Sequence, residues 1–160
     1  MNPSDLIAEL ALRLKLSDFA LNENGLACLG VDETLEIHFE NDQERNRLQV
    51  YSILGSVPAE GKEALFRQLL EGNLFGIETR NAILGIDDVT EEIVLSLALD
   101  CEKVGVDEFE RIVSHFVATV EDWRRRLESS AGGAQEAGTG GENSGSGSAG
   151  LPPAGEGIRA

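Results

Sequence analysis

Residues 34–54 read TLEIHFENDQERNRLQVYSIL, and this stretch decides the fold of the chain. Apolar and polar side chains alternate on both sides of the polar connection NDQERN, which is the periodicity of a strand with one buried face. Because the connection is short, the two strands are predicted to be antiparallel neighbours. The residues predicted to face the core are Leu35, Ile37, Phe39, Leu48, Val50 and Leu54.

Further strands and helices flank this stretch on both sides. Strands are predicted at residues 25–31, 77–86 and 92–99. Helices are predicted from Pro3, behind an Asn2 cap, then over 61–71 with Gly72 just past the end, and finally from Asp107. The arginines at 124–126 are expected in the last turns of that final helix, where cations complement the helix dipole. The order α-β-β-β-α-β-β-α predicts an α+β sandwich with a mostly antiparallel twisted sheet.

The first helix carries more apolar residues than one stripe can hold. Leu6, Ile7, Leu10 and Leu14 recur at helical spacing, whereas Leu12 and Leu16 fall outside that stripe. Two interpretations stay open. The helix is either buried on several sides, or it has one face on the core and a second face available to a partner.

The composition changes sharply near residue 130. Residues 131–160 are rich in Gly, Ser and Glu and have almost nothing to bury, so they cannot recover the entropy of ordering their backbone. We expect a folded domain over residues 1–130 and a disordered tail over 131–160. Three glutamates and one arginine give that tail a charge of −2, so −14 of the total −16 belongs to residues 1–130.

This charge and the hydropathy pattern exclude several classes of partner. A strongly acidic surface repels phosphate backbones, so neither nucleic acid nor an anionic membrane is expected to bind. The N-terminal stretch has no basic region and holds Asp5 and Glu9 within its apolar part, unlike a signal peptide. No apolar run approaches the length of a membrane span. A soluble, cytoplasmic protein is expected.

Residues capable of chemistry are few. Cys28, Cys101, His38 and His115 do not pair at metal-ligand spacing, and both cysteines are predicted to be buried free thiols. A Cys–His pair assembled in space stays open as a minor alternative. The segment 55–63, GSVPAEGKE, approaches a phosphate-binding loop but has five residues between its glycines and Glu63 after the lysine. We therefore expect no enzyme, no cofactor and no metal.

Three stretches carry a resemblance to a known family. These are LLEGNLFG at 69–76, LGIDD at 84–88 with the IVLSLAL strand after it, and FVATVEDWRRRL at 116–127. Together with the N-terminal helix they resemble class I type III secretion chaperones, the Tir chaperone (CesT) family, over residues 3–128. The resemblance implies a bacterial cytoplasmic homodimer that binds the N-terminal segment of a secreted effector in extended form and keeps it competent for secretion. The secretion ATPase is a further candidate partner.

The resemblance also suggests where the two kinds of contact lie. In such chaperones the second helix and the fourth strand make most of the dimer interface, and the first helix and first three strands bind the client. The dimer interface is therefore expected to use Leu65, Phe66, Leu69, Ile77 and Ile83. Apolar residues off the predicted core stripes are the expected client-binding set: Leu12, Leu16, Leu29, Tyr51 and Ile53. The alternative function is a small sensory or regulatory binding module of YbjN type with the same layout.

Overall fold

The computed structural model describes residues 1–136, and residues 137–160, most of the predicted tail, lie outside the described part of the chain. It confirms the predicted α+β architecture. One five-stranded sheet has the order β1-β2-β3-β5-β4, and every neighbouring pair is antiparallel. The strands are β1 (Leu26–Gly30), β2 (Glu36–Asp42), β3 (Arg47–Ser56), β4 (Ile83–Ile86) and β5 (Glu92–Asp100). The helices are α1 (Pro3–Leu14), α2 (Lys62–Gly72) and α3 (Val106–Glu136), with a short 3-10 turn η1 (Leu74–Gly76).

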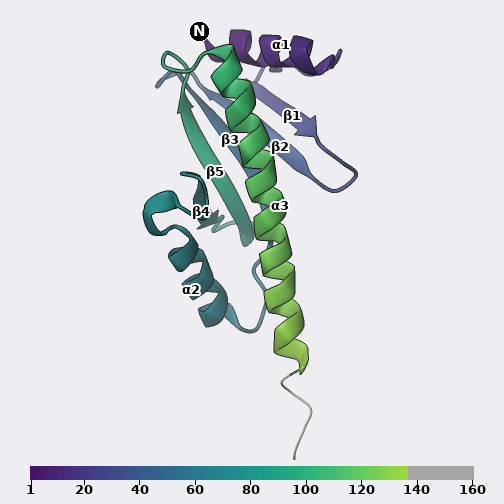
Figure 1. Cartoon of the computed structure of the whole chain (residues 1–160), viewed down its shortest axis with the longest axis vertical. Helices are drawn as coiled ribbons and strands as arrows, with labels where there is room; N and C mark the ends of the chain where they lie inside the picture. Colours follow the sequence, from purple (N-terminus) through teal and green to yellow (C-terminus); the bar gives the residue numbers. More distant parts are fainter. Residues whose placement is uncertain (137–160) are drawn as a thin grey trace, which may run out of the picture.

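The long helix α3 covers one face of the sheet (Figure 1). In the same view α1 crosses the upper end of the molecule, where it contacts α3, and α2 lies beside β4 at the lower end. The predicted alternation holds, since Ile37, Phe39, Leu48 and Val50 are all fully buried beneath the helices. Core packing thus follows directly from the period-two pattern of β2 and β3.

The opposite side of the sheet, which we call the open face, is less buried. Strand register aligns five residues across it in one row: Cys28 pairs with His38, His38 with Tyr51, Tyr51 with Ser96, and Ser96 with Ile83. All five are half-buried or exposed. The sheet therefore has one packed face and one accessible face, as antiparallel sheets commonly do.

The first helix begins and ends as local sequence rules require. The Asn2 side chain accepts a hydrogen bond from the Asp5 amide at 2.9 Å, which confirms the predicted cap. At the other end Lys15 adopts a left-handed conformation with φ of 56°. The amides of Lys15 and Leu16 then donate back to the carbonyls of Leu12 and Ala11, the pattern of a Schellman motif.

The predicted strand over 77–86 is wrong in its first half, because β4 contains only Ile83–Ile86. Arg80 and Asn81 both have left-handed backbone conformations, with φ of 52° and 68°, and the Asn81 amide donates to the carbonyl of Gly76. A left-handed residue reverses the chain direction and cannot continue an extended strand. Residues 77–82 form turns instead.

Two expectations for the ends of helices are also corrected. Gly72 is the last residue of α2 and not the residue after it, and a Cβ at this position would overlap the ring of Trp123 in α3. The arginines at 124–126 do not lie in the last turns, because α3 continues to Glu136. Arg124 instead donates to the carbonyl oxygens of Thr34 at 2.7 Å and Ile53 at 2.9 Å, which ties α3 to the sheet.

Candidate functional site

Two of the predicted client-binding residues project from α1 and the turn that follows it. The Leu12 side chain is 71% exposed and Leu16 is 38% exposed, while the buried residues of the helix lie on its other side. Leu14, which the sequence assigned to the core stripe, is also exposed. The structure therefore favours the second interpretation of this helix, with one face on the core and one free. We call Leu12, Leu14 and Leu16 the α1 surface.

The other three predicted client-binding residues do not share that surface. Tyr51 and Ile53 are half-buried on the open face, opposite to the core. Leu29 pairs with the buried Ile37 and packs partly against the core, so it lies on the side covered by the helices. The five residues are thus divided between the two sides of the sheet. Periodicity could not reveal this for Leu29, because β1 has apolar residues on both faces.

The edge of β1 offers unpaired backbone on one side, since β1 is the first strand of the sheet. Asn22 occupies the near end of this edge: its amide donates to the carbonyl of Leu26 at 2.8 Å, and its side chain accepts from the Leu26 amide at 3.0 Å. Along an edge strand, the backbone N–H and C=O groups of every second residue point away from the sheet. The backbone groups of Cys28 and Gly30 therefore also point toward this edge.

The edge of β4 is closed by a side chain. The amide group of Asn73, just after α2, donates to the Leu84 carbonyl at 2.9 Å and accepts from the Leu84 amide at 2.8 Å. This pair of bonds copies the pairing of a neighbouring strand, so Asn73 acts as a one-residue cap on the sheet and holds the end of α2 against β4. Of the two sheet edges, β1 is the more available.

The predicted dimer residues are exposed with two exceptions. Phe66, Ile77 and Ile83 are 40%, 76% and 63% exposed, whereas Leu65 is half-buried and Leu69 is only 5% exposed in the protomer core. The structure adds residues that the sequence reading left out of this set. We call the group the α2–β4 surface, and its exposed apolar members are Phe66, Leu70, Leu74, Phe75, Ile77 and Ile83.

One member of this surface has an unusual backbone. Phe75 has φ of 58°, and its side chain is 85% exposed. A bulky residue in the left-handed region is strained, and such residues cluster at functional sites. Beside it lies a hollow of about 630 Å³, which the 75–82 segment, β5 and α3 enclose. Residues 69–76, which carry part of the family resemblance, include Phe75 and could have identified it as a surface residue. The periodicity of apolar residues gave no such signal.

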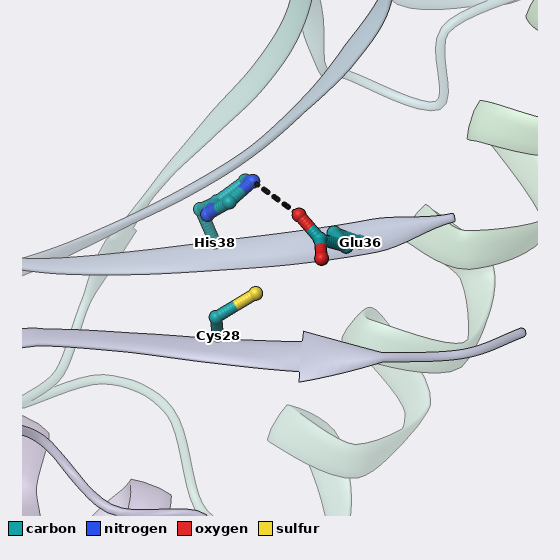
Figure 2. A group of neighbouring side chains, drawn as sticks. All are labelled: Cys28, Glu36 and His38. Atoms are coloured by element: carbon teal, nitrogen blue, oxygen red, sulfur yellow. Dashed lines mark ion pairs between the residues drawn. The ribbon is translucent and has the colours of Figure 1, made fainter. Parts of the chain in front are cut away.

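The open face also brings together three residues that the sequence reading had kept apart. Sγ of Cys28, a carboxylate oxygen of Glu36 and an imidazole nitrogen of His38 all lie within 4.8 Å of one another (Figure 2). Cys28 is exposed, so its predicted burial is wrong, whereas Cys101 is buried as expected and both thiols are free. Partial desolvation by the neighbouring side chains and the charge of Glu36 raise the pKa of the Cys28 thiol above its usual value. Spacing along the chain missed this group because it forms across the β1–β2 pair.

None of the helices in residues 1–136 is long and apolar enough to cross a membrane. The three helices and the five-stranded antiparallel sheet, with one packed and one accessible face, form an α+β fold that matches the structures of type III secretion chaperones. The chain belongs to the Tir chaperone protein (CesT) family, whose model matches residues 5–124. This confirms the resemblance found in the sequence, and the family is one of chaperones.

Individual relatives agree with this assignment. The transcriptional anti-antiactivator ExsC of Pseudomonas aeruginosa is 28% identical over 122 residues, which are 76% of this chain and 83% of ExsC. The crystal structure of the ExsC–ExsE complex matches with a TM-score of 0.65 and 27% identity, covering 78% of this chain and 96% of that one. The structure of the HopA1–SchA chaperone–effector complex matches with a TM-score of 0.59 at 19% identity, covering 76% and 88%, a likeness of fold alone.

Proposed function

We propose that this protein is a bacterial cytoplasmic chaperone that binds the N-terminal segment of a type III secreted effector in extended form. The observation that carries the proposal is membership in the CesT family together with an exposed apolar surface on α1. Binding requires no bond to be made or broken, so no catalytic group is assigned. No observation on residues 1–136 favours the alternative function, a small sensory or regulatory binding module of YbjN type.

The surface chemistry supports an extended client. Exposed leucines are costly unless a partner covers them, since burying one contributes roughly 1.5–3 kcal/mol. Leu12 and Leu16 supply such positions, and the backbone of β1 at Cys28 and Gly30 supplies hydrogen bonds for an added strand. In strand addition the main chain gives affinity and side-chain pockets give selectivity. Leu29 lies on the edge strand itself, whereas Tyr51 and Ile53 lie two strands further in, on β3, and face the opposite side of the sheet.

We also propose a homodimer that pairs the α2–β4 surface of two protomers. Its apolar residues lie within one segment of the chain that runs from α2 through η1 to β4, and symmetric pairing is the commonest way to cover such a patch. Phe66, Ile77 and Ile83 would contact the partner, with Leu65 at the margin. Leu69 would act from beneath, by fixing α2 on the core, because it is already buried in the protomer.

A second candidate concerns the kind of partner. ExsC is named as a transcriptional anti-antiactivator, and it is 28% identical to this chain. A chain of this family could therefore bind a protein that controls transcription, using the same surfaces. The two candidates differ only in the identity of the bound protein.

Purification of the untagged complex from the native bacterium, followed by mass spectrometry, separates these candidates. A secreted protein as the main partner supports the chaperone, and a transcriptional regulator supports the second candidate. The N-terminal segment of the identified partner should then suffice for binding in co-expression. Leu16→Asp and Ile53→Asp should each remove the partner without loss of helical signal. Val89→Asp, which changes an 86% exposed residue in the β4–β5 turn, is the matched control and should bind normally. A folded Leu16→Asp variant that retains the partner would show that the client binds to a surface other than the α1 surface.

We also propose that the folded domain ends near residue 130. Among residues 1–130, Leu127 is the last that packs against the core, and residues 128–130 are exposed. The helix backbone nevertheless continues to Glu136, six residues past the expected boundary. We propose that residues 1–130 hold the interactions needed for folding.

A further inference from the structure

Three different ligand atoms meet on the open face, and neither the proposed function nor the family assignment uses them. Cys28 lies on β1, and Glu36 and His38 lie on β2, with Cys28 and His38 directly paired across the two strands. The His38 Nε2 lies 3.7 Å from the Glu36 carboxylate, and all three ligand atoms are within 4.8 Å of one another. Figure 2 shows the thiol and the carboxylate converging beneath the imidazole.

The surrounding structure holds these side chains in place. The ring of Tyr51 stacks on His38 with a centroid distance of 5.0 Å and an angle of 19°, which restricts the orientation of the imidazole. The buried Ser52 hydroxyl donates to the Glu36 carbonyl at 2.8 Å and fixes the backbone at that residue. Sites built on paired strands are positioned more accurately than sites on loops.

The distances are close to those of a tetrahedral metal site. Zinc bonds to sulfur at about 2.3 Å and to nitrogen or oxygen at about 2.0–2.2 Å, so tetrahedral ligand atoms lie about 3.3–3.6 Å apart. The observed group needs to contract by about 1.5 Å at most, which the exposed Cys28 and Glu36 side chains can do by rotation. A thiolate and a carboxylate would balance the charge of a divalent ion.

One neighbouring cation does not compete for these ligands. Arg124 lines the same hollow as Glu36 and His38, but two of its nitrogens donate to the carbonyls of Thr34 and Ile53. The wider field of the chain, with a net charge of −16, attracts cations.

We propose that Cys28, Glu36 and His38 form a binding site for a divalent transition metal, zinc by preference, with water in the fourth position. A mixed sulfur, nitrogen and oxygen donor set suits zinc and excludes magnesium and calcium, which take oxygen ligands. The inference departs from the expectation drawn from sequence spacing, which considered ligands along the chain and not across strands. The metal ligands are the side chains of Cys28, Glu36 and His38, whereas the proposed client strand pairs with the backbone of β1 at Cys28 and Gly30, so metal binding to the protein without a client tests this proposal separately.

The test uses the full chain without an affinity tag, stripped with a chelator and titrated with Co²⁺ as a spectroscopic substitute for zinc. Wild type should bind one ion with a thiolate-to-cobalt charge-transfer band and strong visible absorption of tetrahedral type, and added Zn²⁺ should remove both. Cys28→Ala should abolish the charge-transfer band. Glu36→Gln and His38→Gln should each weaken binding at least about tenfold, since even residues that only orient metal ligands contribute 10–100-fold.

His115→Gln, a second histidine outside the group, is the matched control and should bind as wild type does. Zinc should also raise the melting temperature of wild type and of this control, but not that of Cys28→Ala, because a ligand stabilises only the state that binds it. The proposal is overturned if folded wild type gives no charge-transfer band, if the band persists in Cys28→Ala, or if His115→Gln loses binding to the same extent as His38→Gln.

Discussion

Gly72 is where α2 docks on α3, and replacing it with alanine sets two physical effects against each other. In a helix, alanine is favoured over glycine by about 0.8–1.0 kcal/mol, so propensity alone predicts that Gly72→Ala stabilises the protein. A Cβ at this position, however, would overlap Cη2 and Cζ2 of the Trp123 ring. Overpacking of this kind costs about 1–3 kcal/mol.

The Trp123 ring has little freedom to move away. It is 1% exposed, its Nε1 donates to the carbonyl of Glu78 at 3.3 Å, and the Arg126 guanidinium lies 5.0 Å from the ring centroid. The clash should therefore exceed the gain in propensity. Because two ring atoms would lie well under 3.0 Å from the added Cβ, the overpacking cost should be near the upper end of its range. We expect a net loss of about 2 kcal/mol, which lowers the melting temperature by roughly 6–10 °C for a domain of this size.

Circular dichroism melts at one fixed protein concentration measure this loss, because the proposed dimer would make the midpoint depend on concentration. Trp123→Phe removes the two overlapping ring atoms, so Gly72→Ala in that background should be neutral or stabilising. Gly85→Ala, where no atom lies within 4 Å of the added Cβ, is the control and should change stability by less than about 0.5 kcal/mol. A stabilising Gly72→Ala, or an equal cost in both backgrounds, would refute the reasoning.

Four further predictions concern the edge of β4, the proposed dimer, two aspartates in turns and the length of chain needed for folding. Asn73→Ala should cost about 1–3 kcal/mol in urea melts, because the amide and carbonyl of Leu84 lose their partner, and an unchanged midpoint would contradict the edge-cap role. Ile83→Asp should give a folded monomer by light scattering, whereas wild type should have twice the mass of one chain; a monomeric wild type contradicts the dimer. Asp32 and Asp87 accept backbone N–H bonds that hold their carboxyl pKa values below the usual range, so their stabilisation is full above the unfolded value of about 3.9 and is lost as the pH falls through the folded pKa. Asp32→Asn with Asp87→Asn should therefore lower stability at neutral pH and flatten its fall below about pH 4 in acid titrations, and an unaltered acid profile would exclude this linkage. A chain cut after Ser130 should melt within error of the full chain, while a large drop would show that later residues contribute to folding.

Local patterns in the sequence were sufficient for the architecture. The alternation in residues 34–54 identified which side chains of β2 and β3 are buried, because successive residues of a strand point to opposite faces. The Asn2 cap and the resemblance in 69–76, 84–88 and 116–127 were equally local. The hydrogen bond from the Asp5 amide confirms the cap, and the family model confirms the resemblance. Such signals need only the few residues on either side of a position.

The placement of the candidate sites was decided by the tertiary structure. Leu69 and Leu70 are neighbours in the helix predicted over 61–71, but Leu69 belongs to the hydrophobic core and is 5% exposed, whereas Leu70 is 72% exposed. Leu29 and Cys28 exchanged the environments expected for them, because β1 is apolar on both faces and only its register with β2 assigns a side. The same register assembles Cys28, Glu36 and His38. Alternation determines which residues of one strand share a face, whereas the residues that lie opposite them depend on pairing between segments that the sequence keeps apart.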